Sequence, residues 1–179
     1  AYFPAIYTIE LYNDDDSICH EFFHSTVPET SNDIGDFMHE GITLILNDEY
    51  YSRNLNTYQM GDDRVIYMKM LMETIGTDKV LEAYSKNDWR IIETELLKIN
   101  PDSSIPNRIR ELMDKYTEIF VANNFDRITA NREAESVKNE LAEIMIDYYE
   151  TKYPNNEESV FYVYDAHFMQ RVNWKFRKT

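Results

Sequence analysis

Helix-breaking residues are sparse in this chain. It has 4 glycines and 5 prolines among 179 residues, so long segments run without an interruption. Such segments favour helices over many short strands. Hydrophobic residues make up 43% of the chain, which is enough to bury a core. The sequence therefore predicts a mainly α fold of the α+β class.

Acidic residues dominate the charge, with 33 of them against 18 basic ones and a formal net charge of −15. Phosphate backbones and anionic lipid surfaces repel such a chain, so we expect no nucleic-acid partner. No apolar run approaches the roughly 18 to 20 residues that span a bilayer, so no membrane-spanning segment is expected. The single cysteine, Cys19, excludes an internal disulfide.

The compartment stays open. The chain starts at Ala1 rather than at a methionine, so we expect a processed or trimmed product that can have lost a leader. An extracytoplasmic location is favoured over a cytoplasmic one.

The predicted elements run from one strand into a series of helices. A β-branched and aromatic run predicts a strand at 5–12. Capping signals and apolar spacing predict helices at about 16–27, 33–51, 64–75, 79–85, 88–99, 104–123 and 127–152. Alternating apolar residues predict a further strand at 159–164.

One motif carries chemistry: residues 20–24 read His-Glu-Phe-Phe-His. On a helix, His20 and His24 leave the same face one turn apart, so their two imidazoles can hold one zinc ion. Glu21 lies about 100° further around the helix, where it can reach a water molecule without being a ligand. Zinc-dependent hydrolysis needs this arrangement, because the metal lowers the pKa of water and the carboxylate accepts its proton.

A zinc site of this kind needs a third protein ligand. Glu40 lies inside the predicted helix at 33–51, and it faces the motif if the two helices pack antiparallel across the loop at Pro28. Two histidines and one glutamate leave one coordination position open, which is typical of catalytic rather than structural zinc.

Other third ligands stay open as alternatives. His39 is adjacent to Glu40 and would point elsewhere on the helix. Asp33 and Asp36 lie near the helix start, where an acidic residue is better explained as capping. Glu29 is too close to the motif on a turning loop.

The segments His-Glu-Phe-Phe-His at 20–24 and His-Glu-Gly-Ile-Thr at 39–43 together resemble the gluzincin metallopeptidases, the thermolysin-like clan of zincins. The resemblance covers about residues 5–51, and His39 stands where the family commonly has asparagine. It implies a zincin-like active-site helix pair, in which His20, His24 and Glu40 bind zinc and Glu21 is the general base. The strand at 5–12 would pair with extended substrate.

The resemblance also implies a division of the chain. Residues 1–57 would form the zincin core with the zinc site, and residues 58–179 a helical subdomain that completes the cleft. Gluzincins build several strands before the zinc helix, whereas 19 residues precede the motif here. We therefore expect a small or incomplete sheet, and an N-terminal domain supplied by a longer protein or by a partner.

Peptide hydrolysis also needs a donor to the developing oxyanion. In the family this donor is often a downstream tyrosine or histidine, so Tyr58 is the first candidate and His167 the second. Thr43 and Asp36 are candidates to orient the zinc-binding histidines.

The sequence thus predicts a zinc metallopeptidase, a gluzincin-like hydrolase acting on peptide or protein substrates. One alternative is a zincin-fold binding module that holds metal with little turnover. Another is a helical interaction domain in which the motif occurs by chance.

Overall fold

The computed structural model describes residues 22–31, 33–51, 62–124, 126–154, 160–165 and 170–175, and within them the chain is mainly helical, as predicted. A short helical segment at 22–25 comes first. The helices that follow are α2 (Gly35–Tyr51), α3 (Asp63–Ile75), α4 (Thr77–Lys86), α5 (Trp89–Ile99), α6 (Ser104–Ala122), α7 (Arg127–Glu133) and α8 (Glu135–Lys152). None of the described helices is both long and apolar enough to cross a membrane.

Local sequence explains where several of these helices begin and end. The side chains of Asp62, Asp88 and Asp126 each accept a hydrogen bond from a free backbone N–H at the start of α3, α5 and α7. Gly76 ends α3. Its φ of +104° is a backbone conformation that glycine adopts without strain. Acidic caps and a glycine stop are signals that can be read from the sequence.

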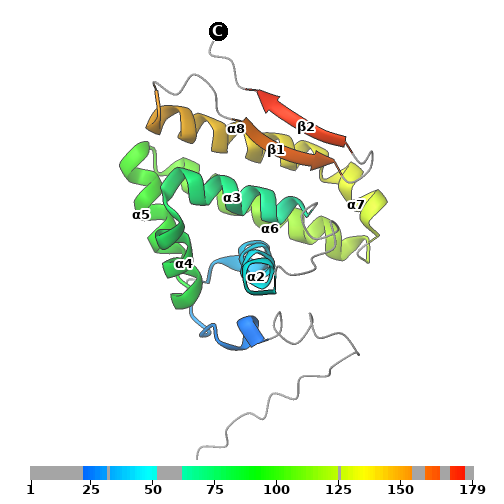
Figure 1. Cartoon of the computed structure of the whole chain (residues 1–179), viewed down its shortest axis with the longest axis horizontal. Coiled ribbons are helices and arrows are strands. Elements are labelled where there is room, and N and C mark those ends of the chain that lie inside the picture. Colours follow the sequence, from blue (N-terminus) through cyan, green and yellow to red (C-terminus); the bar gives the residue numbers. More distant parts are fainter. Residues whose placement is uncertain are drawn as a thin grey trace, which may run out of the picture.

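The helix predicted over 127–152 is wrong in one respect, because it is two helices. Ala134 separates α7 from α8, with ψ −5° instead of the helical value of about −42°. Its side chain is fully buried, and the two helices run in different directions (Figure 1). No breaker residue lies at this point, so the bend depends on packing against other helices and not on local sequence.

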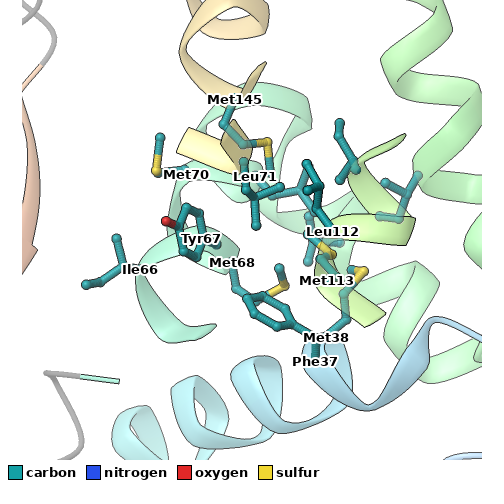
Figure 2. Packing of buried hydrophobic residues seen from close by; sticks show 14 of the residues in the cluster. Phe37, Met38, Ile66, Tyr67, Met68, Met70, Leu71, Leu112, Met113 and Met145 are labelled. Atoms are coloured by element: carbon teal, nitrogen blue, oxygen red, sulfur yellow. The ribbon is translucent and has the colours of Figure 1, made fainter. Parts of the chain in front are cut away.

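Helix α3 lies between α2 and α8, and α6 also contacts both of these helices (Figure 1). It is buried on most of its faces, which fits its lack of a polar face. Figure 2 shows side chains of four helices meeting there, namely Phe37 and Met38 of α2, Met68 and Leu71 of α3, Leu112 and Met113 of α6, and Met145 of α8.

The methionines of α3 belong to this core. Met68 and Met70 are 0% and 3% exposed, and Met72 packs against the cluster. Methionine fills irregular gaps between helices well. Its abundance here therefore reflects core packing.

Two strands, β1 (Val160–Asp165) and β2 (Gln170–Lys175), form an antiparallel hairpin in which Val163 is opposite Val172. β1 corresponds to the strand predicted at 159–164, and β2 was not predicted. Strand β1 of the hairpin contacts α3. The strand predicted at 5–12 and the domain boundary predicted at residue 57 both lie outside the described residues.

Candidate metal centre

The structure brings together two of the residues predicted to bind zinc. The Nε2 atom of His24 lies 3.0 Å from Oε1 of Glu40. His24 comes from the short helical segment at 22–25, and Glu40 from the second turn of α2. The two helical segments therefore face one another across the loop at 26–34, as the zinc prediction requires.

The distance and the donor atoms suit a shared metal ion. Two ligand atoms that each lie about 2.0 to 2.1 Å from a tetrahedral zinc are about 3.3 Å apart. The observed separation of 3.0 Å is close to this value, and it is also that of a hydrogen-bonded ion pair. Since the side chains of His24 and Glu40 are 26% and 33% exposed, a metal ion can reach them from solvent.

Both residues open onto the same cavity, which has a volume of about 360 Å³. Its lining residues are His24, Val27, Pro28, Glu29, Asp36, His39, Glu40 and Asn87. The lining thus combines imidazole and carboxylate groups, the donors that zinc prefers, with an apolar wall.

Asn87 fixes the loop that joins the two helical segments. Its backbone adopts the left-handed conformation (φ 48°, ψ 50°) and ends α4. Its side-chain Nδ2 donates to the carbonyl of Pro28 (2.8 Å), and its Oδ1 accepts from the backbone N–H of Ile34 (3.0 Å). The hydroxyl of Thr30 donates to the Asn87 carbonyl. One residue therefore holds both ends of the loop and its middle.

The same side chain determines which nitrogen of His39 carries a proton. Since a carbonyl can only accept and a backbone N–H can only donate, the contacts with Pro28 and Ile34 fix the orientation of the Asn87 amide. Its Oδ1 lies 3.0 Å from Nε2 of His39, so that nitrogen must donate. A protonated nitrogen has no lone pair for a metal. Only Nδ1 of His39 therefore has a lone pair for a metal, whereas a carboxylate oxygen of Glu40 already lies 3.0 Å from Nε2 of His24.

Of the acidic alternatives, Asp33 caps a helix, whereas Asp36 and Glu29 share the cavity with Glu40. Asp33 accepts from the backbone N–H of Gly35 (3.0 Å), so it caps α2 as predicted. Asp36 and Glu29 line the cavity. Thr43, proposed to orient a histidine, is buried and shares a hydrogen bond of 2.8 Å with the hydroxyl of Tyr84.

Two residues near the site were not singled out from the sequence. Asn87 is one. The other is Arg64, whose Nη1 lies 3.7 Å from the second carboxylate oxygen of Glu40. The spacing Asp62-x-Arg64 at a helix start is a usable signal for the arginine, because such an aspartate can cap the helix and bind the guanidinium together.

A separate buried charge cluster lies at the start of α3. The Asp63 carboxylate accepts from Nζ of Lys138 (3.0 Å) and from the hydroxyl of Tyr116 (3.3 Å). Burial raises the pKa of Asp63, and the nearby Lys138 ammonium opposes this rise. This cluster does not line the cavity.

Several predicted site residues lie outside the described part of the chain: His20, Glu21, Tyr58 and His167. Among the residues that are described, no group of three or more histidine, cysteine, aspartate or glutamate side chains is placed to hold a metal ion. The pair His24 and Glu40 is thus the described portion of the predicted ligand set.

Comparison with known protein families, with curated proteins and with solved structures gives no match. The assignment of a function therefore depends on the motif and on the geometry around it.

Proposed function

We propose that this chain is a zinc-dependent metallopeptidase of the gluzincin type, which hydrolyses peptide bonds. The observation that carries the proposal is the 3.0 Å contact between His24 and Glu40. Sequence spacing selected both residues for metal binding, and they belong to different helical segments. Their contact beside a cavity is what a shared metal ion requires, and the zinc content of the chain distinguishes it from a simple ion pair.

In this proposal His20, His24 and Glu40 hold the ion. When bound, zinc supplies a Lewis acid that lowers the pKa of water and polarises a substrate carbonyl. Glu21 accepts the proton of the attacking water and passes it to the leaving amine. The hydroxyl of Tyr58 donates a hydrogen bond to the developing oxyanion.

The test uses the full chain, with zinc content measured by elemental analysis and cleavage followed on a mixed peptide library with and without a chelator. We expect near-stoichiometric zinc and chelator-sensitive cleavage. Glu21→Gln should keep the metal and lose hydrolysis, because the substituted amide cannot accept the proton. Full activity in this variant would overturn the mechanism.

Ligand variants test the metal centre itself. His24→Ala and Glu40→Gln should each lose most of the bound zinc, while His39→Asn should retain it and serves as the matched control on the same helix. Stoichiometric zinc without cleavage of any peptide would point instead to a binding module, and absence of zinc would point to a helical domain with a chance motif.

A further inference from the structure

The two oxygens of the Glu40 carboxylate face different partners. Oε1 lies 3.0 Å from the imidazole of His24, and Oε2 lies 3.7 Å from Nη1 of Arg64. A glutamate side chain with three rotatable bonds loses rotamer freedom when it binds a metal, at a cost in free energy. A fixed cation on the far oxygen reduces that cost, because it restrains the carboxylate beforehand.

Arg64 is itself firmly held. Asp62 binds it through both carboxylate oxygens, at 2.9 Å from Nε and 2.8 Å from Nη2, and also accepts from its backbone N–H at 3.0 Å. These contacts occupy one edge of the guanidinium, and Nη1 on the other edge lies 3.7 Å from Oε2 of Glu40. Asp62 also balances the charge of Arg64, so the arginine adds little net repulsion toward a metal ion.

Gly41 allows this approach of α3 to α2. A Cβ atom at position 41 would lie 2.9 Å from the backbone oxygen of Arg64 and 2.7 Å from Cγ of Met68, distances that side chains do not tolerate. The absence of a side chain next to Glu40 thus lets the first turn of α3 lie directly against it.

The chain contains a matched comparison at the start of α5. Asp88 binds Arg90 in the same way, at 2.9 Å from Nε, 2.7 Å from Nη2 and 3.1 Å from the backbone N–H. The side chain of Arg90 is 67% exposed, whereas that of Arg64 is 26% exposed. The same local motif thus serves capping alone at α5 and reaches a second carboxylate at α3.

We propose that Arg64 is a positioning residue, which Asp62 and Gly41 place against Glu40 so that this carboxylate is oriented for metal binding. The inference rests on the proposed function, since it takes Glu40 to be a zinc ligand. Removal of a residue that holds a metal ligand in place typically weakens metal binding about 10- to 100-fold.

The first experiment measures zinc dissociation constants of the full chain by competition with a chromophoric chelator. Arg64→Gln should weaken zinc binding about 10- to 100-fold. Arg64→Lys should recover part of the loss, because an ammonium keeps the charge but cannot take both oxygens of Asp62 while facing Glu40. Arg90→Gln removes the same motif from α5 and should leave the affinity unchanged.

A second experiment needs no metal. Urea unfolding midpoints are compared in the presence of a chelator for wild type, Glu40→Gln, Arg64→Gln and the double variant. If Arg64 acts on Glu40, the midpoint shift caused by Arg64→Gln becomes smaller in the Glu40→Gln background.

The outcomes separate the two proposals. Equal zinc affinity in wild type and Arg64→Gln, or equal midpoint shifts in both backgrounds, would overturn the role of Arg64 while leaving the metallopeptidase proposal in place. A wild-type chain that binds no zinc would overturn the metallopeptidase and with it the metal-positioning role, whatever the unfolding data give.

Discussion

At the scale of single residues, Asn87 has the largest structural effect on the candidate site. We predict that Asn87→Gly lowers the free energy of unfolding by about 1 to 3 kcal/mol, because the N–H of buried Ile34 and the carbonyl of Pro28 lose their partner. Glycine adopts the left-handed backbone conformation without strain, so the loss reports the side chain alone. Urea unfolding of the metal-free chain measures it.

The control is Asn124→Gly. Asn124 also has a positive φ, of 49°, but its side chain is exposed. Its replacement should leave stability within about 0.5 kcal/mol of the wild type, as for other surface positions. Similar losses in both variants would show that the left-handed backbone, rather than the contacts of Asn87, determines the effect.

Residues separated by helical spacing can be predicted from sequence, and residues brought in by packing cannot. The juxtaposition of His24 and Glu40 follows from two adjacent helical segments joined by a short loop. Asn87 is distant in the sequence from the loop it binds, and Arg64 reaches Glu40 from another helix. Their contribution depends on how α3 and α4 pack, which a single sequence does not specify.

At the scale of elements, Gly41 sets the separation between α2 and α3. We predict that Gly41→Ala lowers the free energy of unfolding by about 1 to 3 kcal/mol, because the added Cβ meets the backbone of Arg64 at 2.9 Å. This loss should exceed the gain of about 1 kcal/mol that alanine brings to a helix. Thermal or urea unfolding of the metal-free chain tests it.

Thr94→Ala, on an exposed position of α5, is the control for helix propensity and should leave stability unchanged or slightly higher. A stabilised Gly41→Ala variant would mean that α2 and α3 can separate without cost. The close approach of α3 to Gly41 would then not contribute to stability.

The helices themselves could be predicted well because their ends carry local signals. Asp62, Asp88 and Gly76 mark boundaries that depend on backbone hydrogen bonding within a few residues. The bend at Ala134 has no such signal, since alanine favours a continuous helix. Strand β2 was missed because strand pairing depends on a partner elsewhere in the chain.

At the scale of the whole molecule, the pKa shifts predict how stability depends on pH. Burial raises the pKa values of Asp63 and Asp114. The folded state therefore takes up these protons before the unfolded state does, and stability should rise as the pH falls through the raised values. Glu82, bound by two lysines, has its pKa lowered from 4.5 to about 2, so its contribution should be lost over that range. We expect a maximum of stability at mildly acidic pH.

Urea midpoints of the chelator-treated chain at a series of pH values measure this profile. The Asp63→Asn variant separates the contribution of Asp63 from that of the other carboxylates. In that variant the rise on acidification should be smaller, while the fall below about pH 4 should persist because it comes from other carboxylates. An unchanged rise would contradict the assignment to Asp63. Removal of metal is essential, since protons compete with zinc for its ligands.

The contacts of Asn87 have a consequence for how this site could be transplanted or dissected. Thr30 is 57 positions away from Asn87 along the chain, and Pro28 is 59 positions away. A peptide excised around the motif would carry every ligand in its correct order and yet lose the geometry between them. The spacing of the donors is thus a property of tertiary structure, and grafting the motif onto another scaffold requires an equivalent of the α4 terminus.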